Sequence, residues 1–294
     1  MIWCSGWKLA SAVSNSGGLG LIGAGSMYPD VLREHIQKCK QSTDKPFGVN
    51  LPLLYPDIDK HVAIILEEGV KIVFTSAGNP ATWTQKLKSH GITVVHVIAN
   101  TKFARKCEES GVDAIVAEGF EAGGHNGREE TTTMCLIPLV RQACKLPLIA
   151  AGGIGSGMAM AAAIALGADG VQVGSRFAAS VESSAHPHFK QKITELKDGD
   201  TELSLKQLTP VRLIKNEFYQ KVKAAENACA STEELTALLG RGRAKKGMFE
   251  GDLEEGELEI GQVSAGIKDI LPASVIMQNL ITEYNQTLTR LEAL

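Results

Sequence analysis

Residues 147–175, PLIAAGGIGSGMAMAAAIALGADGVQVGS, contain the pattern that decides the fold. The apolar run PLIAA is followed by the glycine turn GGIGSG, the helix-forming run MAMAAAIALG and a second apolar run, GVQV. Two strands that are apolar throughout and flank one helix are typical of a right-handed βαβ unit in a parallel sheet buried on both faces. The stretch therefore predicts an α/β protein.

The same alternation of apolar runs and helix-like segments extends back to residue 19. The expected strands are LGLIG at 19, FGVNL at 47, KIVFTS at 71, TVVHVI at 93, AIVAEG at 114, PLIAAG at 147 and GVQVGS at 170. The helices are expected over 7–15, 28–41, 57–68, 82–89, 101–110, 133–144 and 157–166. Such a series fits either an open doubly wound sheet or a (β/α)8 barrel with one unit missing or disguised.

Polar residues and glycines come directly after several of these strands, which favours the barrel. They are Asn50, Ser76 to Asn79, Glu118, Gly152 and Gly153, and Gly174 and Ser175. In a TIM-type barrel the carboxyl ends of all strands meet at one mouth, so these residues can line a single pocket. We expect the barrel over residues 1–189, a helical lid over 190–250 where the sequence becomes charged and helix-prone, and a C-terminal segment, 251–294, that returns to the barrel.

Composition excludes several classes of protein. The chain has 294 residues, 44% hydrophobic and 21% charged, and its net charge of -3 argues against a nucleic-acid binder or a membrane-surface protein. Its six cysteines are scattered without metal-ligand spacing, so we expect free thiols and no metal site. With no apolar run near the ~20 residues that span a bilayer and no secretory signal, a cytoplasmic location is expected.

Two glycine turns follow the last two strands of the pattern. Gly152 and Gly153 open GGIGSG, and Gly174 and Ser175 end GVQVGS one βα unit later. Bare backbone at the ends of the last two barrel strands is typical of the standard barrel phosphate site. The alternative is two ordinary tight turns.

His125 lies among glycines in EGFEAGGHNG, seven residues after Glu118. A lone histidine is often a structural side chain. Here the glycines remove packing neighbours, and we interpret them as clearance for a planar cofactor or substrate. An imidazole at a barrel mouth can accept or deliver a proton.

Three further motifs favour structural explanations. GLGLIG at 18–23 matches a dinucleotide fingerprint, but its glycines lie before and inside a strand rather than between a strand and a helix. His186 and His188 resemble a metal pair, yet Pro187 between them indicates a loop or helix start. The basic run GRGRAKKG at 240–247 and the acidic run after it are typical of solvated faces, although the basic run is also a candidate contact for NADPH phosphate or acyl carrier protein.

Taken together, the chain resembles the nitronate monooxygenase (2-nitropropane dioxygenase) family, and within it the FMN-dependent enoyl-ACP reductase II branch. The pieces that carry the resemblance are AVSNSGGLGLIGAG, DKPFGVNL, TSAGNP, AIVAEGFEAGGHNG, LPLIAAGGIGSG, GADGVQVGSRF, ESSAHPHFK and GDLEEGELEIGQ. The resemblance implies a (β/α)8 barrel with a helical lid and FMN at its mouth.

The resemblance also implies roles for the residues that match. Asn50 and Glu118 would contact the flavin or its ribityl chain, with Gly123 as close backbone near them. Gly152, Gly153, Gly174 and Ser175 would bind the FMN phosphate. His125 would face the reactive side of the flavin.

The chain departs from the family pattern in two ways. The family's first strand has no counterpart before Met1-Ile2-Trp3, so either this chain is a shortened form of a longer protein or something else fills the gap. We expect the former, and we expect the chain as it stands to hold FMN poorly. Val97 replaces a lysine, and GGHNG replaces GGHPG; both favour the reductase branch.

Three functions follow as expectations. The first is an NAD(P)H-dependent enoyl-ACP reductase of type II fatty acid synthesis, with acyl carrier protein as a possible partner and a homodimer as a possible assembly. The second is a nitronate monooxygenase that oxidises alkyl nitronates with O2 and uses His125 as a base. The third is a flavin- or phosphate-binding barrel without catalysis.

Overall fold

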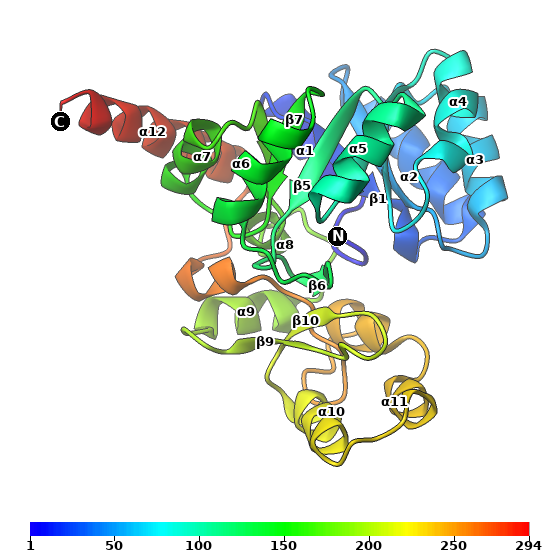
Figure 1. Ribbon diagram of the computed structural model, residues 1–294, viewed down its shortest axis with the longest axis vertical. Coiled ribbons are helices and arrows are strands. Elements are labelled where there is room, and N and C mark those ends of the chain that lie inside the picture. The colour runs from blue at the N-terminus through cyan, green and yellow to red at the C-terminus, as the bar shows by residue number, and fades with distance from the viewer. Residues whose placement is uncertain (294) are drawn as a thin grey trace.

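The computed structural model describes residues 1–293 and contains the parallel sheet that the sequence predicts (Figure 1). Its seven strands are hydrogen-bonded in the order β1-β2-β3-β4-β5-β7-β8, and every neighbouring pair is parallel. They are β1 (Gly20–Gly23), β2 (Phe47–Pro52), β3 (Ile72–Ser76), β4 (Thr93–Ile98), β5 (Ala114–Glu118), β7 (Leu148–Ala151) and β8 (Gly170–Gln172). The sheet curls and alternates with helices in the manner of a TIM-type barrel, which confirms the predicted fold.

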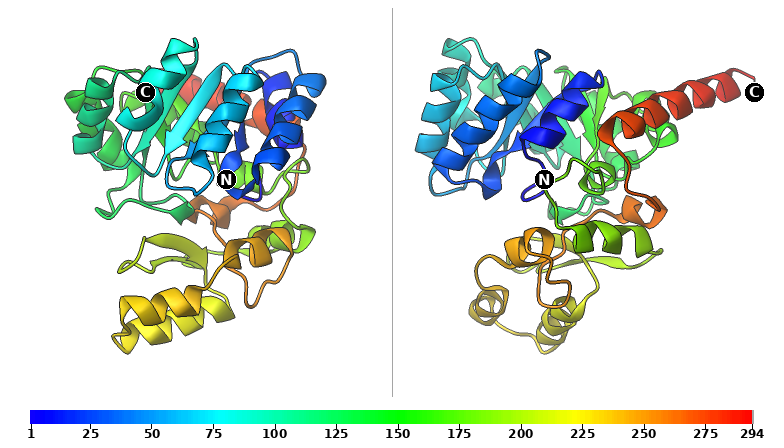
Figure 2. Two further views of the ribbon diagram at one scale, coloured as in Figure 1. Left: turned by 90° about the vertical axis from the view of Figure 1, so that its right-hand side faces the viewer. Right: turned by 180° about the vertical axis from the view of Figure 1, so that it is seen from behind.

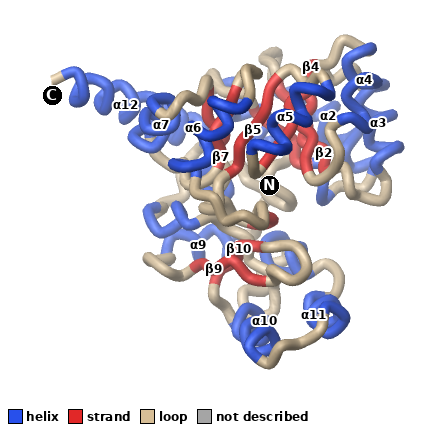
Figure 3. The backbone as a smooth tube through the Cα atoms, viewed as in Figure 1, coloured by secondary structure: helices blue, strands red, loops and turns tan. Residues whose placement is uncertain are grey.

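Helices cover the outside of the curled sheet (Figure 3). They are α1 (Trp7–Asn15), α2 (Pro29–Ser42), α3 (Ile58–Glu67), α4 (Ala81–Ser89), α5 (Thr101–Ser110), α6 (Thr133–Ala143) and α7 (Gly157–Ala165). Local sequence sets their ends: the Asn100 side chain accepts from the Phe103 N–H at the start of α5, and Gly111, with φ of 76°, ends it. The predicted bounds are therefore correct to within one or two residues.

Alternation along the strands divides the core into two layers. Phe74, Val95, Val116 and Ala151 point inward and fill the interior of the barrel. Their neighbours, such as Val73, Val94 and Ile115, pack outward against the helices in the larger apolar cluster. A residue's position in the strand thus decides whether its side chain faces the barrel axis.

The N-terminal segment lies at the opening between the two edge strands of the sheet, β1 and β8. The Gly23 N–H donates to Ser5 O (2.9 Å) at the end of β1, while the Ser184 N–H donates to Cys4 O (3.0 Å) beyond the short helix α8 (Ser175–Ala178). Residues 1–5 therefore bridge the two edges at the carboxyl end of the strands. The turn η1 (Ala24–Ser26) follows β1 at the same end.

The lid lies below the barrel and is not purely helical (Figure 1). It contains α9 (Pro187–Glu195), β9 (Thr201–Ser204), β10 (Val211–Ile214), α10 (Glu217–Asn227), α11 (Thr232–Leu239) and the π-helical turn η2 (Lys245–Phe249). The two strands, absent from the sequence prediction, are short and partly polar. They form because β10 pairs on one side with β9 and on the other with β6 (Gly124–His125), which comes from the barrel.

The C-terminal segment packs on the barrel. After η3 (Gln262–Gly266), helix α12 (Ala273–Glu292) packs against α7 and α1 through Ala273, Ile276 and Leu280. Its last turns extend away from the body of the molecule (Figure 2), with Ile281, Leu288 and Leu291 exposed. Among residues 1–293, no helix combines the length and the apolar character that a membrane crossing requires.

Candidate active site

Three polar side chains point into the barrel near the carboxyl ends of the strands. Asn50 lies between Val49 and Leu51, which face the outer helices, so alternation directs Asn50 inward. Glu118 is the last residue of β5 and continues the inward series of Ala114 and Val116. Gln172 ends β8 between outward-facing Val171 and Val173 and was missed by the sequence prediction, although a lone polar residue in GVQV was a usable signal.

Glu118 is half-buried, and within residues 1–293 it forms no ion pair with lysine or arginine. Burial raises the pKa of its carboxyl from 4.5 to about 7. A carboxyl of this kind is partly protonated near neutral pH and can therefore donate as well as accept a hydrogen bond. Such groups are concentrated at functional sites.

The two predicted glycine turns lie side by side, because β7 and β8 are neighbours in the sheet. Gly152 and Gly153 have φ of 93° and 67°, a region that favours glycine. Within the described chain, the backbone N–H groups of Gly152, Gly153, Gly174 and Ser175 donate to no protein acceptor. Several free donors on one mouth suit a phosphate group.

Glu121 and Thr133 support the first of these turns. The Glu121 carboxylate accepts from the Thr133 N–H (3.0 Å), and the Thr133 hydroxyl lies 2.9 Å from both Glu121 Oε2 and Gly152 O. A Cβ at position 152 would lie 2.8 Å from Gly119 O. The turn is thus built against the loop after β5.

His125 is exposed and belongs to β6, opposite Val211 of the lid. The surrounding glycines do not leave open space, which corrects the interpretation of them as clearance. A Cβ on Gly123 would lie 2.4 Å from the carbonyl carbon of Ile260, and one on Gly127 would lie 2.4 Å from Ala99 Cβ. The glycines instead allow other parts of the chain to approach the loop.

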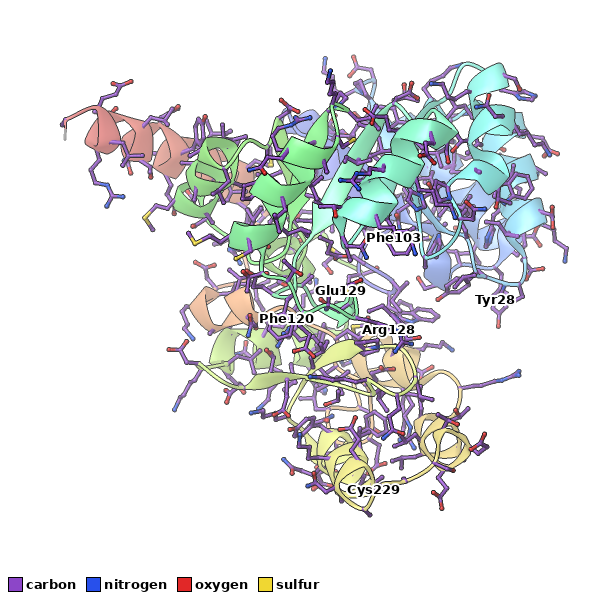
Figure 4. All side chains as sticks on the ribbon, in the orientation of Figure 1. Tyr28, Phe103, Phe120, Arg128, Glu129 and Cys229 are labelled. Carbon is purple, nitrogen blue, oxygen red and sulfur yellow. The ribbon has the colours of Figure 1, made fainter. Side chains whose placement is uncertain are left out.

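The loop that carries His125 connects the barrel to the lid (Figure 4). Arg128 donates to Lys206 O (3.0 Å) and Leu208 O (2.5 Å) in the turn between β9 and β10. The buried Arg212 of β10 donates to Phe120 O (2.9 Å), and its guanidinium lies 4.4 Å from the centre of the Phe120 ring. Contacts with β10 and with the turn between β9 and β10 therefore fix the position of the loop that carries His125.

Residues 256–262, called the roof segment below, cross the mouth beside this loop. The Gly261 N–H donates to Ser175 Oγ (3.0 Å), and the Gln262 N–H donates to Glu121 O (2.9 Å). Glu257 and Glu259 lie on this segment and were not among the predicted site residues. Two acidic residues alternating with apolar ones in GELEIG were the available signal.

Comparison with known proteins identifies the family. The model of the nitronate monooxygenase family matches residues 1–61 and 54–283, nearly the whole chain. The chain belongs to the nitronate monooxygenase family. Members of this family are flavin-dependent oxidoreductases, and the protein is an oxidoreductase enzyme.

Relatives within and around the family carry different names. The structure of FabK from Thermotoga maritima has a TM-score of 0.95 and 41% identity, covering 100% of this chain and 93% of that one. A probable nitronate monooxygenase of Staphylococcus saprophyticus is 30% identical, with 96% and 92% covered. A (3aS,4S,5R,7aS)-5-hydroxy-7a-methyl-1-oxo-octahydro-1H-indene-4-carboxyl-CoA dehydrogenase of Mycobacterium tuberculosis is 34% identical over 78% of this chain, which spans only 65% of that enzyme's length.

Other sequence motifs in this family member have structural roles. His186 caps α9 with Pro187 in its first turn, as predicted.

In the basic run, Arg243, Lys245 and Lys246 pair with Glu255, Glu250 and Asp252. Of its four cations only Arg241 has no carboxylate partner within the described residues, so most of this charge is neutralised.

Proposed function

We propose that the protein is an FMN-dependent enoyl-ACP reductase that uses NADH or NADPH. The observation that carries the flavin assignment is the pair of adjacent turns with free N–H groups after β7 and β8. Gly152, Gly153, Gly174 and Ser175 would hold the FMN phosphate there. FMN, when bound, would carry hydride from the pyridine nucleotide to the enoyl thioester.

The remaining residues orient the cofactor and handle protons. Asn50 and Glu118 point into the barrel and would bind polar atoms of the flavin and its ribityl chain. Gly123 lets the roof segment close over the mouth. His125, exposed beside the mouth, would deliver the proton to the α-carbon of the substrate.

Sequence identity to known proteins supports the reductase function over the nitronate monooxygenase function. FabK, an enoyl-ACP reductase II, shares 41% identity with this chain over its full length, against 30% for the nitronate monooxygenase relative. The carboxyl-CoA dehydrogenase relative also has a thioester in its name, which favours an acyl thioester substrate. The expected acyl carrier protein contact and homodimer stay predictions.

Nitronate monooxygenase is the second candidate, because the family model and full-length relatives bear that name. In this function His125 would remove the proton from a neutral nitroalkane, and no pyridine nucleotide would be needed. A non-catalytic flavin-binding barrel is the third and would turn over neither substrate.

An anaerobic assay separates these functions. The FMN-loaded protein is mixed with NADH or NADPH, and crotonyl thioester or an alkyl nitronate is then added. Bleaching of the flavin by the nucleotide and recovery on addition of thioester support the reductase. Absence of bleaching, with turnover of nitronate in air, would support the monooxygenase instead.

The role of His125 is tested by His125→Ala. We expect the flavin spectrum to be retained and turnover to fall by about a hundredfold or more. His90→Ala is the control, because His90 is an exposed histidine at the end of α4. Loss of flavin or of folded protein in His125→Ala alone would show that the histidine is structural.

A further inference from the structure

The roof segment carries one buried acidic side chain, Glu257, and one partly buried acidic side chain, Glu259. Glu257 is only 7% exposed, and within residues 1–293 neither it nor Glu259 forms an ion pair with lysine or arginine. Burial raises the pKa of Glu257 to about 8 and also raises the pKa of Glu259. Burying unpaired carboxyls opposes folding, so their presence at the mouth calls for a functional explanation.

Strand β10 sets the spacing between Glu259 and His125. His125 pairs with Val211, and Glu259 forms an antiparallel bridge with Leu213, two residues farther along the same strand. Both lie on the same edge of β10, because the opposite edge is occupied by β9, where Leu213 pairs with Glu202. Two residues along a strand separate their backbones by about 7 Å.

The residue before His125 makes room for the Glu259 carboxyl. Gly124 has φ of 76°, and a Cβ on it would lie 2.5 Å from Glu259 Oε2. Any other residue at position 124 would displace that carboxyl. The absence of a side chain here is therefore matched to Glu259, not to empty space.

The roof segment is fixed at several points around this carboxyl. The Ile214 N–H donates to Leu258 O (2.9 Å) and the Gly261 N–H to Ser175 Oγ (3.0 Å), one on each side of Glu259. The titratable groups that face Glu259 are His125 of β6, Tyr55 after β2, Cys4 and the Met1 amino group of the N-terminal segment, and Glu257, which itself faces Arg243. Among the side chains, His125 is the one whose positive form stabilises the Glu259 carboxylate.

We propose that Glu259 is a positioning residue that holds the imidazole of His125 at the mouth and restores its proton after each turnover, with Glu257 as a second carboxyl of the same proton store. The proposal rests on the proposed role of His125. After the imidazole gives its proton to the substrate, the Glu259 O–H bond breaks, the proton moves to the ring nitrogen and a carboxylate remains. Solvent then reprotonates that carboxylate.

The first test does not depend on turnover. Carbon-13 NMR titration of the Glu259 carboxyl in flavin-free protein should give a midpoint above that of an ordinary glutamate. The midpoint should move higher in His125→Ala, because removal of a neighbouring positive charge disfavours the carboxylate. A midpoint that does not move would overturn the proposal even if the proposed reaction is correct.

The second test uses Glu259→Gln, which keeps the shape of the side chain and removes its ionisation. We expect unchanged flavin content and flavin reduction, turnover lowered about tenfold or more, and a changed pH–rate profile. Glu259→Asp should recover part of the turnover, and Glu259→Gln should cost little when added to His125→Ala. Glu254→Gln, an exposed acid two residues before the roof segment, is the control.

The outcomes separate the two proposals. Wild-type turnover and pH profile in Glu259→Gln, or loss of flavin or folded protein in that variant, would overturn the role of Glu259. Failure of the wild-type protein to reduce the enoyl thioester would instead overturn the proposed function, and the NMR result would still decide whether the two side chains are coupled.

Discussion

The hydroxyl of Ser175 accepts a hydrogen bond from the backbone N–H of Gly261 at 3.0 Å. This contact joins the turn after β8, where the flavin phosphate is proposed to bind, to the roof segment that carries Glu259. The contact therefore ties the position of the roof segment to that of the turn after β8.

Ser175→Ala removes this acceptor and should loosen the roof segment. We expect the unfolding free energy to fall by about 1 kcal/mol and flavin to bind more weakly. Thermal unfolding and flavin titration measure the two effects. Ser16→Ala, whose hydroxyl contacts only the last turn of its own helix, should leave flavin affinity unchanged. Equal behaviour of the two variants would show that the Ser175 contact contributes nothing.

Gly123→Ala should destabilise the protein, because its Cβ would lie within 2.6 Å of three backbone atoms of Ile260 and Gly261. Displacing backbone to relieve such overlap costs about 1–3 kcal/mol. Urea unfolding measures the loss. Gly266→Ala is the matched control, since a Cβ there meets nothing within 4 Å. Wild-type stability in Gly123→Ala would contradict the close packing of this loop.

Gly152→Ala should weaken flavin binding at least about tenfold, because positive φ and the nearby Gly119 O both force the turn to move. Gly199→Ala, in the loop between α9 and β9, is the control for backbone strain outside the turn. Gly199 has a similar φ of 80° but no neighbour within 4 Å, so it tests backbone strain alone. Flavin affinity measured by fluorescence quenching should fall only in Gly152→Ala. A matched loss in both variants would remove the turn from the proposed phosphate site.

Glu118 should make stability depend on pH. Its pKa is raised to about 7 in the folded protein from an ordinary 4.5, so the folded state holds a proton that the unfolded chain releases between those values. The contribution of this carboxyl to the free energy of unfolding is therefore fully present below about pH 4.5, and it is lost as the pH rises to about 7. Glu118→Gln has no carboxyl to ionise at this position, so its unfolding free energy should rise relative to that of wild type as the pH increases from about 4.5 to about 7.

Urea unfolding of the flavin-free proteins at several pH values between about 4.5 and 7.5 measures the effect. Glu109→Gln, an exposed acid on α5, is the control. A constant difference between Glu118→Gln and wild type over this range would show that the carboxyl is not held protonated.

Much of the fold was predictable because its signals are local. An apolar run followed by a glycine or polar residue and a helix-forming segment identifies each βα unit without knowledge of its neighbours. The lid strands β9 and β10 were not predictable in this way. TELS and VRLI are short, and they become strands because they pair with each other and with β6, which lies far away in the sequence.

The positions of the candidate site residues were partly predictable for the same reason, while their roles stay predictions. Asn50, Glu118 and the two glycine turns follow strands, so the barrel pattern alone brings them to one mouth. Gln172 was missed although its signal was local. Glu259 could not be placed, because its proximity to His125 depends on a bridge to Leu213 and on the space left by Gly124.

By itself, the sequence determined the alternation of strands and helices, the family and the residues that end the strands, because these properties follow from periodicity and motifs within short stretches. Only the tertiary structure decided what the glycines around His125 are for. A glycine in the sequence does not by itself tell whether it serves a positive φ, an open space or the close approach of another part of the chain. Here the roof segment occupies that space and brings the Glu259 carboxyl against Gly124, next to His125.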